Sequence, residues 1–191
     1  MTKNSGFWAL VLAAGAGARF GGDKLRAPWG EGRLIDAALA AAKAAPVDGV
    51  ILLHRPGDAL SADPDVRVVD VPDHAEGMAA SLRAGVAALP GTCIGAFVFL
   101  GDMPRIPVRV FQPLAEAVRA GASAAAPVWR GELGHPVLFS STLFPDLLRL
   151  AGDRGGRSVI AGLGERLVRV EAPDDGVLFD VDAPEGLGLR R

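Results

Sequence analysis

The chain has 191 residues, half of them hydrophobic, with a formal charge of −2 and a single cysteine. This length fits one domain, and the near-neutral charge gives no electrostatic reason to expect a nucleic-acid or anionic-membrane partner. One cysteine excludes an internal disulfide framework and suits the cytoplasm, where we expect the protein to act. No apolar stretch reaches the ~18 residues that a membrane span requires.

Short apolar runs alternate along the chain with longer segments whose apolar residues recur at helical spacing. The first half predicts buried strands at 7–13, 49–54, 66–71 and 95–101 and helices at 33–45, 77–89 and 108–121. Pro113 is expected to kink or restart the last of these helices. The alternation continues through 123–129, 135–140, 142–152, 156–164 and 166–172. It predicts one three-layer, doubly wound α/β domain with a mostly parallel, Rossmann-like sheet.

A glycine-rich stretch, LAAGAGARFGGDKL at 12–25, follows the first predicted strand. Glycines at that place let backbone N–H groups turn toward a phosphate. A dinucleotide-binding fingerprint would need a third glycine where Phe20 stands, and a phosphate-binding Walker loop would need Ser or Thr where Leu25 follows Lys24. Two interpretations remain open: an ordinary tight turn, and a loop that binds several phosphates through Arg19 and Lys24.

The phosphate-binding interpretation gives each part of the loop a role. Arg19 and Lys24 neutralise a triphosphate, while the backbone of Ala13, Ala14, Gly15 and Gly17 approaches the nucleotide closely. The stretch resembles the L-A-x-G-x-x-x-R-x-G-x-x-K loop of nucleotidyltransferases that act on nucleoside triphosphates.

Carboxylates follow two further apolar segments. Asp102 ends the run VFLGD, at the sheet edge where open α/β proteins bind ligands, and is predicted to ligate Mg²⁺; a helix-capping role is the alternative. Asp180 and Asp182, in LFDVDAPE, alternate on a predicted strand, so only one of them is expected to face the site. We expect Asp182 to be the second metal ligand and Asp180 to lie at the surface or to cap.

The remaining candidate residues lie at element starts and in loops. Gly77, Met78 and Ser81, near the start of the predicted helix at 77–89, are expected to hold the base and ribose; as alternatives, Gly77 only breaks the helix and Met78 fills the core. Gly134 and His135 precede a strand in a loop that is expected to overhang the ligand edge of the sheet, with a structural or exposed histidine as the alternative. Asp153, Arg154 and Arg157 lie in GDRGGRS, which suits an anionic acceptor. We therefore predict acceptor binding by Gly134, His135, Asp153 and Arg157.

Taken in order, LAAG…R.G..K, EGMAASLRAG, FLGDMP, GHPVLF, GDRGGRS and DVDAPE resemble the motifs of molybdenum cofactor cytidylyltransferases and their MobA-like relatives, from about residue 8 to 187. The resemblance implies transfer of CMP from CTP to the phosphate of molybdopterin cofactor, with release of pyrophosphate and a requirement for Mg²⁺. Lys24, Asp102 and Asp182 would hold the triphosphate and metal. Gly17 departs from the family, because many relatives have Ser there.

The resemblance also implies an organisation of the domain over 1–191, with nucleotide binding at about 7–104 and acceptor binding at about 105–187. A molybdenum hydroxylase or its maturation factor would be the client. Leu12–Ala13–Ala14–Gly15 in place of L-A-G-G favours CTP over GTP, because the Ala14 methyl occupies space that a purine needs. Two alternatives stay open: a non-catalytic cofactor-binding maturation protein, and a nucleotidyltransferase for another small phosphorylated acceptor.

Overall fold

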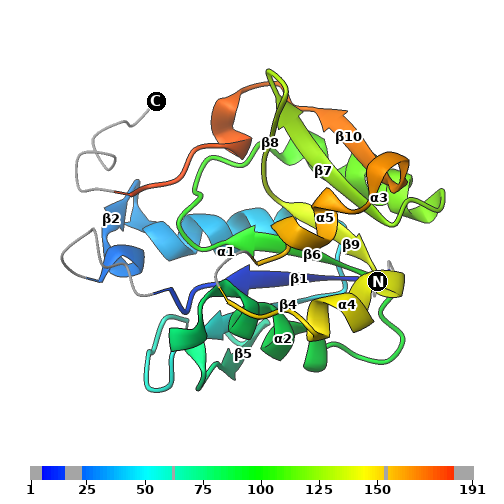
Figure 1. Cartoon of the computed structure of the whole chain (residues 1–191). Coiled ribbons are helices and arrows are strands. Elements are labelled where there is room, and N and C mark those ends of the chain that lie inside the picture. The colour runs from blue at the N-terminus through cyan, green and yellow to red at the C-terminus, as the bar shows by residue number, and fades with distance from the viewer. Residues whose placement is uncertain (1–5, 16–22, 62, 153–154, 183–191) are drawn as a thin grey trace.

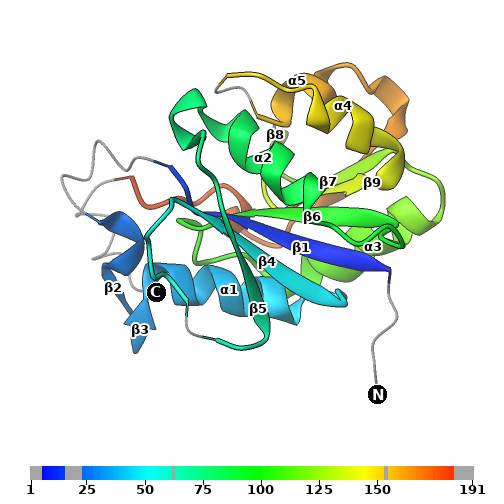
Figure 2. The ribbon, with the colours of Figure 1, turned by 90° about the horizontal axis from the view of Figure 1, so that it is seen from below.

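The structure is a computed structural model of the chain and describes residues 6–15, 23–61, 63–152 and 155–182. A single large sheet lies between two layers of helices (Figures 1 and 2). The strand order is β10-β7-β9-β6-β1-β4-β5, and β8 pairs with β7. The predicted three-layer, doubly wound α/β fold is confirmed.

The centre and one side of the sheet come from the first half of the chain. β1 (Phe7–Leu12) pairs in parallel with both β4 (Gly49–His54) and β6 (Gly95–Leu100), and β4 pairs in parallel with β5 (Val66–Asp70). The three inner strands are almost wholly buried because helices cover both of their faces, which explains their continuous apolar sequences.

The second half adds four strands, and two of them reverse direction. β9 (Val137–Ser140) is antiparallel to β6 and β7 (Ala124–Trp129), whereas β10 (Leu167–Glu171) is parallel to β7. β8 (Glu132–Leu133) forms a hairpin with β7. The connection from β7 to β9 is too short for a crossover that would return a parallel strand, so β9 runs the other way.

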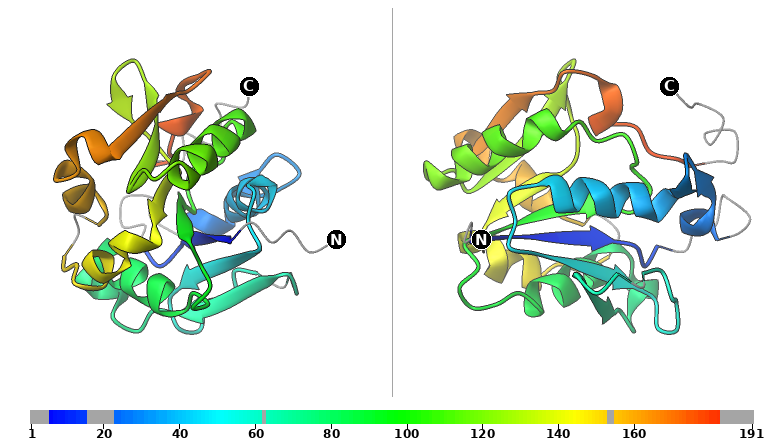
Figure 3. Two further views of the ribbon diagram at one scale, coloured as in Figure 1. Left: turned by 90° about the vertical axis from the view of Figure 1, so that its right-hand side faces the viewer. Right: turned by 180° about the vertical axis from the view of Figure 1, so that it is seen from behind.

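The helices divide between the two faces of the sheet. α1 (Leu34–Ala44) and α3 (Phe111–Arg119) cover one face, and α2 (Met78–Ala87), α4 (Phe144–Leu148) and α5 (Arg157–Ala161) cover the other (Figures 2 and 3). None of the helices in the described ranges is long and apolar enough to cross a membrane.

Short elements complete the fold. β2 (Pro28–Trp29) and β3 (Gly32–Arg33) form a small separate hairpin. The 3₁₀ helices are η1 (Lys24–Arg26), η2 (His74–Glu76), η3 (Val108–Val110), η4 (Ser141–Leu143), η5 (Gly164–Arg166) and η6 (Asp175–Val177).

Pro113 does not interrupt a helix running from 108, as the sequence suggested. η3 occupies 108–110, and α3 begins at Phe111, so Pro113 is its third residue. The backbone N–H groups of the first turn have no partner within the helix, and a proline there therefore costs no helical hydrogen bond.

The core on the α1 and α3 face is organised around Phe97. Its ring centroid lies 5.9 Å from that of Phe7, 6.2 Å from Phe99 and 6.3 Å from Phe111, and all four rings are fully buried. Edge-to-face geometry in two of these pairs adds to the stabilisation that burial provides. Phe97 thus joins β1, β6 and α3.

We expect Phe97→Ala to lower the free energy of unfolding by about 3–5 kcal/mol, because it removes a buried ring and leaves a cavity. Urea unfolding monitored by far-UV circular dichroism measures the change. Val168→Ala, at a side chain that is 37% exposed, is the control and should change stability by less than about 0.5 kcal/mol. A loss below 1 kcal/mol in Phe97→Ala would contradict the central place given to this ring.

Candidate functional site

The site lies at the carboxyl ends of β1 and β6, the edge that the sequence predicted. Gly101, directly after β6, donates its backbone N–H to the carbonyl of Leu12 at 2.9 Å. Leu25 of η1 packs against the core on the α1 face, and a Cβ at Gly101 would lie 3.4 Å from it. The partly buried Leu25 holds the η1 turn over the strand ends and so positions Lys24.

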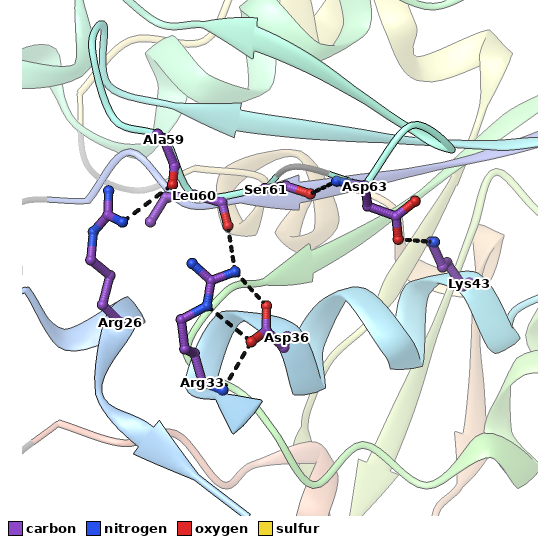
Figure 4. Close-up of polar contacts among 8 residues, drawn as sticks. All are labelled: Arg26, Arg33, Asp36, Lys43, Ala59, Leu60, Ser61 and Asp63. Atoms are coloured by element: carbon purple, nitrogen blue, oxygen red, sulfur yellow. Dashed lines mark hydrogen bonds and ion pairs between the residues drawn. The ribbon is translucent and has the colours of Figure 1, made fainter. Parts of the chain in front are cut away.

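The β4–β5 connection also anchors the η1 turn (Figure 4). Arg26 donates to the Asp23 carboxylate at 2.5 Å and to the carbonyl of Ala59 at 3.2 Å. Nearby, Arg33 pairs with Asp36 and donates to the carbonyl of Leu60 at 2.9 Å. The two arginines therefore tie the turn that carries Lys24, and the start of α1, to the same stretch of backbone.

Lys24 lies between two carboxylates. Its Nζ is 2.8 Å from Asp102 Oδ2 and 3.5 Å from Asp182 Oδ1. The Lys24 side chain is only 12% exposed, whereas that of Asp182 is 57% exposed. The three residues that the sequence assigned to the triphosphate and metal thus converge, although they come from three separate parts of the chain.

Asp180 is exposed, as the sequence predicted, but it also joins this cluster, so the expectation that only Asp182 faces the site is wrong. The segment 178–182 is not a strand, so its side chains do not alternate between two faces. One carboxylate oxygen from each of Asp102, Asp180 and Asp182 lies within 4.8 Å of the others. Partial burial, followed by the negative charges of Asp182 and Asp102, raises the pKa of Asp180 above its ordinary value.

The donor set fits a hard divalent cation. Mg²⁺ and Mn²⁺ prefer oxygen ligands, and Mg²⁺ is usually held by one or two carboxylates together with phosphate oxygens and water. Three exposed or half-buried carboxylates, with a lysine beside them for a phosphate, provide that combination.

Gly134 and His135 hold the segment that leads to these carboxylates. His135 donates its backbone N–H to the carbonyl of Val177 at 2.8 Å, and a Cβ at Gly134 would collide with that same carbonyl. The ring Nδ1 lies 3.5 Å from the carbonyl of Val98. Burial lowers the pKa of His135, the cationic Arg157 acts in the same direction, and Asp102 opposes both. The imidazole is therefore neutral near pH 7.

The start of α2 meets the loop that precedes α5. Gly77 adopts φ of +98°, a conformation that favours glycine, and Ser81 is buried. The backbone N–H of Ala79 donates to the carbonyl of Gly152 at 3.1 Å, and Gly155 packs against the Met78 side chain. Residues predicted for the base and residues bordering the predicted acceptor loop thus lie side by side.

Some predicted residues lie outside the described ranges: Gly17, Arg19 and Asp153. Their proposed roles stay predictions. Arg157, the first residue of α5, is exposed, and Ala13 and Ala14 are buried.

The structure also adds residues that sequence reasoning did not assign. Arg26 and Arg33 anchor backbone carbonyls, and His54, buried at the end of β4, has its Nε2 3.1 Å from Asp70 Oδ1. The sequence offered two signals for them: Arg26 is a basic residue shortly after the glycine-rich loop, and His54 is a polar residue at the end of an apolar strand.

A lysine and three carboxylates gather at the strand ends of this Rossmann-like sheet, and the comparisons with known proteins place such a chain among the nucleotidyltransferases. The model of the MobA-like NTP transferase domain family matches residues 9–170, and the chain belongs to that family. Over 92% of its length it is 24% identical to the molybdenum cofactor cytidylyltransferase of Escherichia coli (strain K12), 91% of which is covered. It is 29% identical to the purine catabolism protein PucB of Bacillus subtilis (strain 168), with 95% of this chain and 94% of that protein covered.

Solved structures agree with this assignment. The Mycobacterium tuberculosis rv0371c homolog from Mycobacterium sp. strain JC1 superposes with a TM-score of 0.85 at 30% identity, covering 96% of this chain and 94% of that one. Rv0371C of Mycobacterium tuberculosis H37Rv in complex with manganese gives 0.75 at 26% identity, covering 87% of each chain. A nucleotidyl transferase from Methanothermobacter thermautotroptrophicus gives 0.79 at 26% identity, covering 94% and 93%.

The neutral state of the half-buried His135 predicts a specific acid response. Because its pKa is lowered in the folded protein, the unfolded chain takes up a proton first as the pH falls through about 6.5, and the folded state loses stability. We expect the stability advantage of wild type over His135→Gln to shrink between pH 7.5 and pH 5.5. Urea unfolding at three pH values measures it. Curves that stay parallel, or diverge at low pH, would show that the folded protein does not disfavour the imidazolium.

Proposed function

We propose that the protein transfers CMP from CTP to the terminal phosphate of molybdopterin cofactor and releases pyrophosphate. The observation that carries the proposal is the convergence of Lys24 with Asp102, Asp180 and Asp182 at the strand ends. Similarity to the E. coli molybdenum cofactor cytidylyltransferase supports the choice of nucleotide and acceptor. The nucleotide side comprises about 7–104 and the acceptor side about 105–187, with a molybdenum hydroxylase or its maturation factor as client.

In this reaction a phosphate oxygen of the acceptor attacks the α-phosphorus of CTP, and the bond from the α-phosphorus to the bridging oxygen breaks. Lys24 binds the triphosphate and neutralises charge that builds up on the leaving pyrophosphate. Asp102 and Asp182, with Asp180 beside them, hold Mg²⁺, which neutralises phosphate charge when it is bound. The manganese complex of the related Rv0371C supports a divalent-cation requirement. Positioning two anions in line supplies most of the acceleration.

The acceptor side is assigned to the segments around β9 and α5. His135 is neutral and half-buried beside Asp102, and Arg157 is exposed at the start of α5. A neutral imidazole offers a hydrogen-bond acceptor without adding charge, and the guanidinium of Arg157 suits the acceptor phosphate. Gly134 allows the close approach that puts His135 in place. The role of Asp153 in acceptor binding stays a prediction from the sequence.

The charge cluster predicts different effects of two substitutions on CTP binding and on turnover. Lys24→Ala should weaken CTP binding and lower turnover together, because the ammonium contacts phosphate in the ground and transition states. Asp102→Ala should lower turnover by at least about 100-fold at every Mg²⁺ concentration, as expected for loss of an electrostatic group at the reacting centre. Pyrophosphate release from CTP, GTP, ATP and UTP with molybdopterin cofactor measures both.

Each outcome of that assay decides between functions. Tight cofactor binding without pyrophosphate release from any nucleotide would favour a non-catalytic maturation protein. Release only with a different phosphorylated acceptor would favour another nucleotidyltransferase. Full activity of Asp102→Ala would leave Asp102 without a metal role.

A second prediction concerns the base. Ala14 is 2% exposed and belongs to the same buried cluster as Ala80 in the first turn of α2, where we place the base. Its methyl then limits the room for a purine, and overpacking by a few atoms costs ~1–3 kcal/mol. Wild type should therefore prefer CTP over GTP by about tenfold or more, and Ala14→Gly should gain GTP activity while keeping most CTP activity. Equal use of both nucleotides by wild type would refute this basis for selectivity.

A further inference from the structure

The ring of Phe179 contacts both a cation and a second aromatic side chain. Cζ of Arg105 is 4.6 Å from the Phe179 ring centroid, and the centroid of Trp29 is 6.2 Å from it at an interplanar angle of 44°. We propose that this stack is the positioning device that sets Asp180 and Asp182 against Lys24 and Asp102 for metal binding. The inference rests on the proposed function, because that function places a divalent cation among these carboxylates.

The stack joins the three segments that form the cluster. Trp29 is in β2, a short distance along the chain from Lys24, and Arg105 lies in the turn that follows Asp102. Phe179 directly precedes Asp180. Residues 178–182 run alongside β2, at the end of the sheet where β1 finishes (Figures 1 and 3). One ring therefore contacts both parts of the chain that must be fixed relative to Asp180 and Asp182.

The segment needs such an anchor because it has no regular secondary structure of its own. Residues 178–182 belong neither to a helix nor to a strand. The backbone N–H groups of Leu178 and Phe179 donate to the carbonyl of Asp175, and that of Val181, whose side chain is fully buried, donates to the carbonyl of Asp102 at 3.1 Å. These contacts fix the backbone on both sides of Asp180, and the ring of Phe179 adds a side-chain contact directly before that carboxylate.

Arg105 is itself held at both ends. Its guanidinium lies 3.4 Å from Asp175 Oδ1, and a Cβ at Gly176 would collide with its backbone carbonyl. The 3₁₀ helix η6 thus packs against Arg105 before the chain continues to Phe179. Because a planar guanidinium can stack on a ring and pair with a carboxylate at once, Arg105 fits this place better than lysine would.

The three side chains lie at the surface of the site and not in the core. Trp29, Arg105 and Phe179 are each partly exposed, and Phe179 is absent from both buried core clusters of the described residues. Side chains that orient metal ligands from outside the coordination sphere typically change metal affinity by 10–100-fold when replaced.

Direct Mn²⁺ binding to the full chain tests the proposal without any enzymatic turnover. Free Mn²⁺ is measured by electron paramagnetic resonance for wild type, Phe179→Leu and Phe179→Tyr. We expect Phe179→Leu to bind Mn²⁺ about tenfold more weakly, because it loses both ring contacts. Phe179→Tyr keeps the ring and both of its contacts, so its Mn²⁺ affinity should stay within about twofold of that of wild type.

Phe144→Leu is the matched control, since it makes the same chemical change at a partly buried ring on the opposite face of the sheet. It should leave Mn²⁺ binding unchanged. Arg105→Met removes the cation that lies over the Phe179 ring and should also weaken Mn²⁺ binding, whether or not Phe179→Leu folds well. CTP binding measured without metal should be unaltered in Phe179→Leu and in Arg105→Met, because both variants retain Lys24.

The outcomes separate the inference from the function on which it rests. If Phe179→Leu and Arg105→Met bind Mn²⁺ as tightly as Phe144→Leu does, the stack is only packing and the inference is overturned, while the transferase function stands. If wild type binds Mn²⁺ and the stack variants lose it, but CTP yields no pyrophosphate, the proposed function fails and the positioning role stands. Wild type that binds no Mn²⁺ overturns the inference.

Discussion

The ammonium of Lys24, set between Asp102 and Asp182, holds together parts of the chain that nothing in the sequence connects directly. Three carboxylates within 4.8 Å of one another repel strongly where water is partly excluded, and a nearby cation offsets that repulsion. A half-buried ion pair is weak evidence for stability, because desolvation cancels much of the attraction. The effect of the ion pair is geometric: it fixes the relative positions of η1, the turn after β6 and residues 178–182. A divalent cation bound to the carboxylates would take over this neutralisation and leave Lys24 for the triphosphate.

The reversed strand β9 explains why the segment that we propose for acceptor binding reaches the carboxylate cluster. Because β9 is antiparallel to β6 and β7, its first residues lie at the edge where those strands end. His135, just before β9, can therefore donate to Val177 and hold the segment that continues to Asp180. Gly134 permits this approach, since any side chain there would meet the Val177 carbonyl. The GHP and DVD motifs thus form a single structural feature, although they are far apart in the sequence.

The sequence predicts well what depends on burial and strand order. Continuous apolar runs marked β1, β4 and β6, and the rule that ligands bind beyond parallel strand ends brought Lys24 and Asp102 together correctly. Asp180 was misplaced because period-two alternation was assumed for 178–182, which has no strand partner in the described residues. The contacts of Arg26 and Arg33 with the β4–β5 connection could not be predicted. Their partners there are backbone carbonyls, which every residue type has.

The contacts between the two halves bear on how nucleotide and acceptor meet. Sequence order places the residues that we propose for the base before 104 and those that we propose for the acceptor after 105, yet Ala79 of α2 donates to Gly152, and Val181 donates to Asp102. Transfer between two anions requires the attacking oxygen to lie ~3–3.5 Å from phosphorus, so the two binding surfaces must share a boundary. Met78 and Gly155 lie on that boundary, where the two halves contact each other. A substitution at this boundary should therefore alter the binding of both substrates. A substitution far from the boundary should alter the binding of only one of them.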